Sequence, residues 1–586
     1  MSRGTARKHD ASTELPVDQS TLVTDYETPI FRATLGWELT RHLIALIATL
    51  LFGLAAAQAA QKHPVPQVQA TDSAQVPLYP DLGSLHYPVT TNVPVAQRYF
   101  DQGLRLYYAF NHQEAIRSFQ EGARLDPNCA ICYWGIALAY GPNINAPMDT
   151  TGGRLASTAL QQALKHEKQV SERERVLIRA LATRYATEPP VDRAELDAAY
   201  ARAMADVVLR FPDDLEAKTL YAESLMDLSP WDYWTSDGKP KPNTTKLLSH
   251  LEQVLAADPN HPGANHFYIH AVEAVQPERA IEAAKRLAGL MPGAGHLVHM
   301  PGHIYIRVGR YEDAIKANEH AVHADETYIR DHSPVTGIYV LGYYPHNYDF
   351  LAFAASMIGR EKQAISTADK IASMVPKELL REQGMAFLQH HQTRNLQMRV
   401  RFGRWDELLS ADAPAEDLPH ARAIWLYAHG RALAARGHFK AAEAAVAQLQ
   451  AIARDPQVKS LRLEFNTSGT VLGIAGEVLA GHIAAAKGDL THAIDRLREA
   501  ARREDTLVYG EPPEWTVPVR QELGSLLRQA GRPDEAERVF REDLKRFPRN
   551  LWSQQGLAEA LRSLNRETEA EAIIERVRAI RASAQE

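Results

Sequence analysis

The sequence predicts an all-α protein in which repeated helix pairs stack into a solenoid. A first observation is a spaced set of small, aromatic and proline residues, namely Gly103, Ala115, Phe119 and Pro127. A second is that this spacing recurs, at Gly302/Ala314, Gly481/Ala493 and Gly524/Ala536/Phe540/Pro548. A third is that other prolines mark further repeat ends, at Pro212, Pro259, Pro292 and Pro376. Self-similarity at a short period is typical of units that bury their apolar faces only against their neighbours.

This spacing resembles the tetratricopeptide repeat (TPR), which has a small residue at position 8, Ala at 20, an aromatic at 24 and Pro at 32. The resemblance covers about residues 95 to 580. It implies a right-handed superhelical solenoid of about eight to ten TPR-like helix pairs. It also implies that the first helix of each pair lines a concave groove, with positions 2, 5, 9, 12 and 13 directed into it.

Length and composition agree with such an array. The 586 residues are 45% hydrophobic and 23% charged, which is ordinary for a globular chain and excludes a fibrous or low-complexity protein. The net charge of −7 leaves no basic excess, so we expect no nucleic-acid partner. The expected organisation is a tail with a signal (1–60), a linker (61–94), N-terminal repeats (95–228), an inserted loop (229–243), central repeats (244–376) and C-terminal repeats (377–586).

The N-terminal region contains a secretory signal pattern. An uncharged run from Leu43 to Ala57 follows Arg41 and ends in the small-x-small pattern Ala57-Gln58-Ala59. We therefore expect a signal peptide near residues 41–60 and a periplasmic or secreted protein. The run is shorter than the roughly 20 residues that cross a bilayer, and an uncleaved signal anchor is the alternative and the only expected membrane contact.

Two cysteines, Cys129 and Cys132, form a single C-x-x-C motif. Tyr133 follows, so the haem-attachment sequence C-x-x-C-H is absent, and no second C-x-x-C completes a zinc ribbon. A local disulfide, unpaired thiols, and a redox or metal role all remain open.

Histidines concentrate in one part of the chain. Ten of the 24 lie between residues 261 and 346, where an even spread would place about three or four. In HFYIHAVE, a helical spacing brings His266, His270 and Glu273 onto one stripe, and HLVHMPGH does the same for another set, His296, His299 and His303. Two such stripes on neighbouring helices about 8–10 Å apart bring their imidazoles together, as a metal site requires.

Two further residues, His346 and Asp349, occupy groove positions of the next repeat, and Glu223 is a weaker candidate in the preceding one. The predicted metal ligands are therefore His266, His270, Glu273, His296, His299, His303, His346 and Asp349. Imidazole ligands without a thiol favour copper or zinc as the cofactor, with iron as a further option. One or two ions fit six histidines, and the carboxylates either complete the shell or orient a ligand ring.

The alternative is a metal-free protein-protein interaction scaffold that binds a peptide or partner in the groove. Metal handling or storage without catalysis is a third hypothesis. The sequence lacks a P-loop, a G-x-G-x-x-G turn, a G-x-S-x-G elbow and an H-E-x-x-H helix, so any chemistry depends on the histidines. Enzymatic activity is left open, and no catalytic residue is assigned.

The segment also resembles a functionally unassigned group of exported bacterial TPR proteins with the motifs NHxYIHAVE, GHLVHMPxHIYxRxGRY and YPHN, usually with EPPxW near the C-terminus. The matching stretches here are Asn265–Glu273, Gly295–Tyr311, Tyr344–Asn347 and Glu511–Trp515. The resemblance implies a shared site and no particular activity. Asp349 departs from it, because the group's pattern has His at that place, which puts the metal identity or the coordination number in question.

Two loops are candidates for covering the site. The stretch from Pro230 to Asn243 interrupts the repeat spacing, and its Trp231, Tyr233 and Trp234 either form a lid beside the histidines or pack over the solenoid edge. The stretch YGEPPEW, from Tyr509 to Trp515, either reaches across the superhelix or only precedes a helix.

Overall fold

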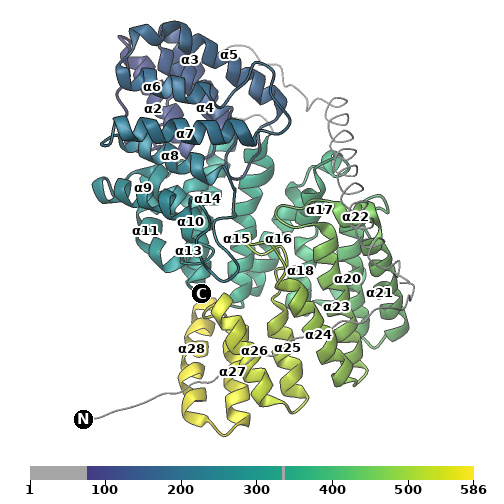
Figure 1. The fold of residues 1–586 in the computed structure, drawn as a ribbon. Helices are drawn as coiled ribbons and strands as arrows, with labels where there is room; N and C mark the ends of the chain where they lie inside the picture. Colours follow the sequence, from purple (N-terminus) through teal and green to yellow (C-terminus); the bar gives the residue numbers. More distant parts are fainter. Residues whose placement is uncertain (1–75, 333–336, 586) are drawn as a thin grey trace, which may run out of the picture. The chain divides into compact units, whose positions relative to one another are not determined.

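The computed structural model describes residues 76–332 and 337–585. The predicted signal peptide, the predicted tail before it and the first part of the predicted linker lie outside these residues. Within the described residues, regular structure is helical, and β-bridges occur only as isolated pairs. The chain is therefore an all-α helical repeat solenoid, as the sequence predicts (Figure 1).

Consecutive helices contact each other in pairs along the whole described chain. The N-terminal pairs are α2 (Pro94–Tyr108) with α3 (His112–Leu125), α4 (Ala130–Ala139) with α5 (Thr150–His166), α6 (Glu172–Ala182) with α7 (Ala194–Arg210), and α8 (Leu215–Met226) with α9 (Thr244–Ala257). The central pairs are α10 (Pro262–Val272) with α11 (Ile281–Leu290), α12 (Gly295–His299) and α13 (Pro301–Arg307) with α14 (Tyr311–His332), and α15 (Tyr344–Met357) with α16 (Glu361–Met374).

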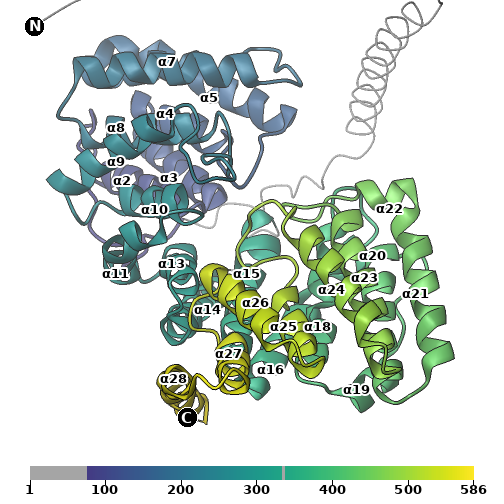
Figure 2. The same ribbon diagram turned by 60° about the horizontal axis from the view of Figure 1, so that its bottom comes forward.

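The C-terminal repeats continue the pattern with some irregularity at their start. Their pairs are α17 (Ala386–Gln392) and α18 (Arg394–Arg401) with α19 (Trp405–Ser410), α20 (Pro419–Ala435) with α21 (Phe439–Arg454), α23 (Ser468–Ala486) with α24 (Leu490–Glu504), α25 (Val519–Gln529) with α26 (Pro533–Arg546), and α27 (Leu551–Ser563) with α28 (Glu567–Gln585). The short α22 (Pro456–Ser460) precedes α23. There are more pairs than the eight to ten expected, because several pairs lack the proline that marks a repeat end. Figure 2 shows the last pairs side by side.

Prolines follow the second helix of several pairs at a constant spacing. The residue before a proline is pushed out of the helical region, so the helix ends just before it. Before Pro212, for example, Phe211 has φ −127° and ψ 69°. The same two-residue spacing separates each helix end from its proline at Leu125/Pro127, Arg210/Pro212, Ala257/Pro259, Leu290/Pro292, Met374/Pro376 and Arg546/Pro548.

The small residues of the repeat allow close helix packing, as predicted. A Cβ atom added at Gly103 or Gly135 would lie 2.6 Å from the ring of Phe119, and one added at Gly524 would lie 2.6 Å from the ring of Phe540. Such separations are far below van der Waals contact. The aromatic side chain of the second helix therefore occupies the space that the glycines leave free.

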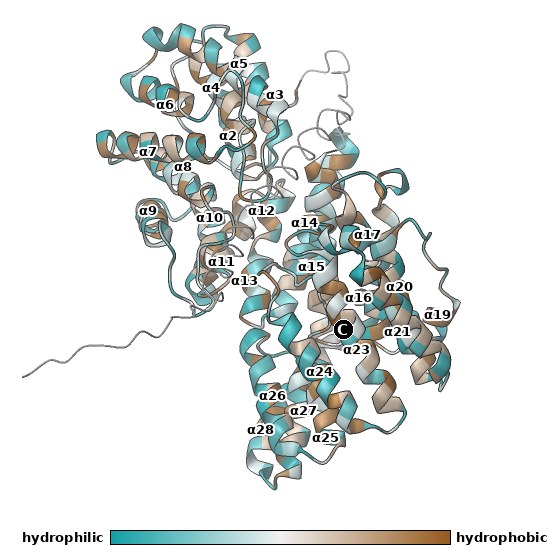
Figure 3. Ribbon diagram, turned by 45° about the vertical axis from the view of Figure 1, so that its right-hand side comes forward, coloured by the Kyte–Doolittle hydropathy of each residue, from teal (hydrophilic) through white to brown (hydrophobic). Residues whose placement is uncertain are grey.

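Two large hydrophobic clusters form the core, one over the N-terminal and central repeats and one over the C-terminal repeats. Helices such as α26 and α28 carry hydrophilic residues on much of their length (Figure 3). Among the described helices, α23 alone is long and apolar enough to cross a membrane. It packs against α20, α21 and α24, which is the arrangement of a core helix.

Candidate metal centre

The predicted ligands lie on the first helices of three consecutive pairs. Helix α10 carries His266 and His270, α12 and α13 carry His296, His299 and His303, and α15 carries His346. Helix α10 contacts α13, and α12 contacts α15. A spacing of three or four residues keeps the imidazoles of each helix on one face, so the three faces meet.

The rings form one continuous cluster. Ring centroids lie 5.0 Å apart for His266 and His296, 5.3 Å for His270 and His303, and 5.0 Å for His299 and His346. Three groups have ligand atoms within 4.8 Å of one another: His266/His270/His296, His299/His303/His346 and His270/Glu273/His303. We call the first two the upstream group and the downstream group.

The cluster is buried, whereas the sequence predicted side chains that line the concave groove of the solenoid. The five histidines of α10, α12 and α13 expose at most 2% of their surface, and His346 is half-buried. Burial lowers the pKa of His266, His270, His296 and His299, and that of His346 to about 3. These rings are therefore neutral at pH 7, as metal ligation requires.

Hydrogen bonds determine which nitrogen of each ring carries the proton. The Nδ1 of His266 lies 2.7 Å from the carbonyl oxygen of Tyr108, and the Nδ1 of His299 lies 2.8 Å from Oδ1 of Asn318. The Asn318 amide is oriented in turn, because its Nδ2 donates to the carbonyl of Ala314. Both acceptors require a proton on Nδ1, which leaves the lone pair on Nε2.

Glu273, at the end of α10, orients two more rings. Its Oε1 lies 3.0 Å from Nδ1 of His270, and its Oε2 lies 2.5 Å from Nδ1 of His303. Burial alone would raise the pKa of Glu273, but the interactions with His303 and His270 lower it to about 2. The carboxylate is thus an acceptor for one ring of each group, an arrangement typical of residues that orient metal-ligating histidines.

The Nε2 atoms of these rings face one another. Those of His299 and His303 lie 2.9 Å apart, and those of His266 and His296 lie 3.2 Å apart. Two nitrogens on one tetrahedral metal, each at 2.0–2.1 Å, are about 3.3 Å apart. In addition, His270 Nε2 and His296 Nδ1 are buried without a hydrogen-bond partner.

Asp349 does not join any of the three groups. Its Oδ2 lies 2.6 Å from Nη2 of Arg394, a guanidinium that is 1% exposed. A buried cation requires a nearby anion, which accounts for the position of the carboxylate. Asp349 therefore neutralises Arg394. The ligand groups among the described residues consist of histidines and Glu273, without Asp349.

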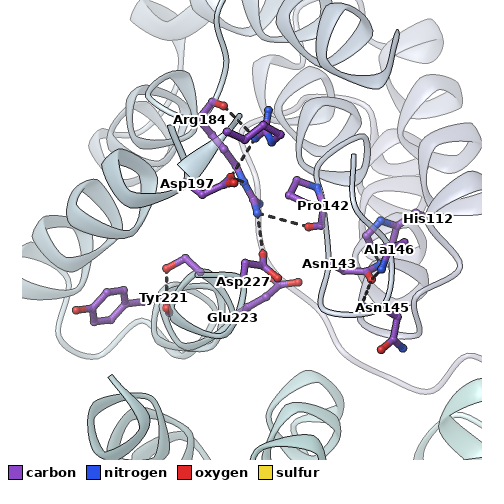
Figure 4. Close-up of polar contacts among 12 residues, drawn as sticks. His112, Pro142, Asn143, Asn145, Ala146, Arg184, Asp197, Tyr221, Glu223 and Asp227 are labelled. Atoms are coloured by element: carbon purple, nitrogen blue, oxygen red, sulfur yellow. Dashed lines mark hydrogen bonds and ion pairs between the residues drawn. The ribbon is translucent and has the colours of Figure 1, made fainter. Parts of the chain in front are cut away.

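Glu223, the weaker candidate, also lies outside the groups. Its Oε2 accepts a hydrogen bond from Tyr107 (2.7 Å). It lies beside a separate network in which Arg184 contacts Asp227 at 2.7 Å and Asp197 at 3.2 Å (Figure 4). This network joins the N-terminal helices and has no histidine ligand group.

The inserted loop covers part of the cluster. The ring of Trp231 lies 5.0 Å from that of His270, and its Nε1 donates to Oδ1 of Asn145 (3.1 Å). Trp234 donates to the carbonyl of Ala271 (2.8 Å). Of the two arrangements that the sequence left open for this loop, the structure has the one in which Trp231 lies beside the histidines.

Aromatic side chains that the sequence analysis did not select also pack against the histidines. The Phe110 ring lies 4.5 Å from His266 and 5.4 Å from His296, and the Tyr343 ring lies 4.6 Å from His296. Phe110 has φ 56°, which few non-glycine residues adopt, so the turn after α2 is held in an unusual conformation. No repeat position distinguishes either residue in the sequence.

The loop from Tyr509 to Trp515 reaches the central repeats. This is the first of the two arrangements that the sequence left open for it. The Glu511 carboxylate lies 3.6 Å from Arg307, and that guanidinium lies over the Tyr509 ring. The Glu514 carbonyl accepts hydrogen bonds from His390 and Arg394, each at 3.1 Å. The C-terminal repeats are thereby joined to the helices that hold the histidines.

Further histidines lie just beyond the cluster. His391 Nε2 is 2.7 Å from Glu464, and His390 contacts His420, which contacts Ser468. Sequence analysis missed them, although the pair His390–His391 is visible as a doublet, because it lies outside the dense region. His390 and His420 hydrogen-bond each other and protein oxygens, whereas Nδ1 of His391 is buried without a hydrogen-bond partner.

The two cysteines form a disulfide between Cys129 and Cys132, both fully buried. The local disulfide, one of the readings left open by the sequence, is the one that the structure contains.

Comparison with known proteins supports the repeated fold. Residues 527–585 match the tetratricopeptide repeat family. No curated protein sequence matches the chain. Similar solved structures include a human IFIT1 dimer with m7Gppp-AAAA (15% identity, 84% of this chain and 92% of that one, TM-score 0.31) and yeast Tom70 (13%, 84% and 99%, 0.30). At these scores the similarity gives no information about ligands or partners.

Proposed function

We propose that this chain is an exported repeat protein whose buried histidine cluster binds a transition metal, with copper or zinc ahead of iron. The observation that carries the proposal is the 2.9 Å separation between the Nε2 atoms of His299 and His303. In the neutral form of each ring, with the Nδ1 proton directed at Asn318 or Glu273, Nε2 presents a lone pair. Two facing lone pairs repel unless a cation lies close to both.

The donor set supports a transition metal. Neutral imidazoles suit copper, zinc, nickel and iron, whereas calcium and magnesium prefer oxygen ligands. A tetrahedral ion held by three histidines has a fourth position open, as in catalytic sites. Water or dioxygen could bind there, so the site would allow either hydrolysis or redox chemistry.

The test is the metal content of protein purified from its native host without a His-tag or chelator. Mass spectrometry on the wild type should find near-stoichiometric metal, and the double variant His299→Ala/His303→Ala should lose at least half of it. The matched control is His320→Ala/His323→Ala, which removes two exposed histidines of α14. Equal metal in all three proteins, or none in the wild type, would refute the proposal.

A metal-free scaffold that binds a protein partner is the second candidate, favoured by the repeated helix-pair fold, since stacked repeats create extended binding surfaces. The buried rings are not accessible to a peptide, so such a partner would contact other side chains. Unchanged thermal stability with each added metal, together with a co-purifying partner of fixed stoichiometry, would favour this function.

A further inference from the structure

The six histidines fall into two groups of three, and one carboxylate contacts a ring of each. The upstream group (His266, His270, His296) and the downstream group (His299, His303, His346) have no ligand in common. Glu273 accepts from one ring of each and so couples their orientation. If the proposed metal binding holds, this arrangement accommodates two ions, each with three imidazoles and an open position.

Charge balance decides which ions fit. Neutral imidazoles bring no negative charge. The carboxylates that interact with the ligand rings are Glu273 and Glu511, which act on His303, and Glu464, which acts on His346. Arg307 lies 3.6 Å from Glu511 and offsets one of them. Two divalent ions would add four positive charges to this region, whereas two monovalent ions add two. Because uncompensated buried charge is costly, the surroundings favour a pair of monovalent ions.

We propose that the upstream and downstream groups hold two cuprous ions and that this pair takes up one molecule of dioxygen. Among the first-row metals that suit imidazole ligands, copper is the one with a common monovalent state, the cuprous ion. Each ion gives one electron to dioxygen, which becomes peroxide, and both ions become cupric. The O–O bond stays intact, no proton is transferred, and no other reductant is needed for this step.

The step suits a buried centre because its net charge does not change. Two cuprous ions and neutral dioxygen carry two positive charges, and two cupric ions with a peroxide dianion carry the same. No ion has to enter or leave through the protein. The apolar rings of Trp231, Phe110 and Tyr343 against these histidines favour a small neutral ligand over a charged substrate.

The test uses the full chain, loaded anaerobically with cuprous ion and washed free of excess. We expect two coppers per chain, consumption of one dioxygen per two coppers, and a shift of the X-ray absorption edge of both ions from cuprous to cupric. Acid quenching should release peroxide in the same amount as the dioxygen consumed. These measurements need only the wild type, so they hold even if a variant fails to fold.

Group-specific variants separate this inference from the proposed function. Removal of either group, by His266→Ala/His270→Ala or His299→Ala/His303→Ala, should leave about one copper per chain and abolish the dioxygen uptake. The His320→Ala/His323→Ala control should behave as the wild type. One copper per wild-type chain, or two coppers without dioxygen uptake, would overturn the inference and leave metal binding standing. Absence of copper, with no other metal in the purified protein, would overturn both.

Discussion

Glu273→Gln is the substitution that most directly tests how the cluster is organised. The native carboxylate accepts from Nδ1 of His270 at 3.0 Å and from Nδ1 of His303 at 2.5 Å. Glutamine has nearly the same shape but only one oxygen, and its NH₂ group can only donate. One of the two rings therefore meets a donor where it had an acceptor.

The expected magnitude follows from that loss. A ring that faces the NH₂ group must move its proton to Nε2, which removes the lone pair that would bind metal, or rotate away. Loss of an orienting partner lowers metal affinity about 10- to 100-fold, equivalent to about 1.4–2.7 kcal/mol. Since the carboxylate serves one ring of each group, the weakened ion belongs to the group whose ring faces the amide nitrogen.

The assay is competition between the protein and a chromophoric chelator for each metal, with circular dichroism to verify folding. Glu223→Gln is the matched control, because it changes a carboxylate that is 3% exposed and lies outside the ligand groups. A folded Glu273→Gln protein whose metal affinity stays within twofold of the wild type would refute the orienting role. Equal weakening by Glu223→Gln would show that the effect is not local.

Three further predictions concern the helices around the cluster. Arg394→Met leaves the Asp349 carboxylate buried without its partner and should lower the free energy of unfolding by about 3–5 kcal/mol, with partial rescue by Asp349→Asn in a urea denaturation series. Gly295→Ala should cost about 1–3 kcal/mol in the same assay, because its Cβ would overlap the Asp325 carboxylate. The control is Gly289→Ala, whose Cβ would have no atom within 4 Å and which therefore lacks this clash. Burial raises the pKa of Asp325 from 3.8 to about 7, so the folded state binds the extra proton and stability should fall by about 4 kcal/mol as pH rises from 4 to 7. Asp325→Asn should flatten this dependence in pH-resolved thermal unfolding, and an unchanged slope would contradict the assignment.

Much of the fold can be predicted from local sequence because its rules are local. A proline two residues after a second helix and a glycine beneath an aromatic ring both act within one repeat, so the roles of Pro212 and Gly103 can be predicted from local sequence. The stripe of His266 and His270 follows from helical periodicity in the same way. Helix pairs that lack this proline and glycine cannot be recognised in the same way, so the sequence predicts fewer pairs than the structure contains.

The sequence by itself determined the repeated helix pairs and the histidines that meet. Only the tertiary structure decided that the rings are buried, that they divide into two groups, and that Glu273 orients a ring of each. It also placed Asp349 on Arg394, a partner 45 residues away, and brought Trp231 and Phe110 against the rings. The physical reason is that periodicity places side chains on a face, whereas burial, proton position and charge pairing depend on which distant segments pack against that face.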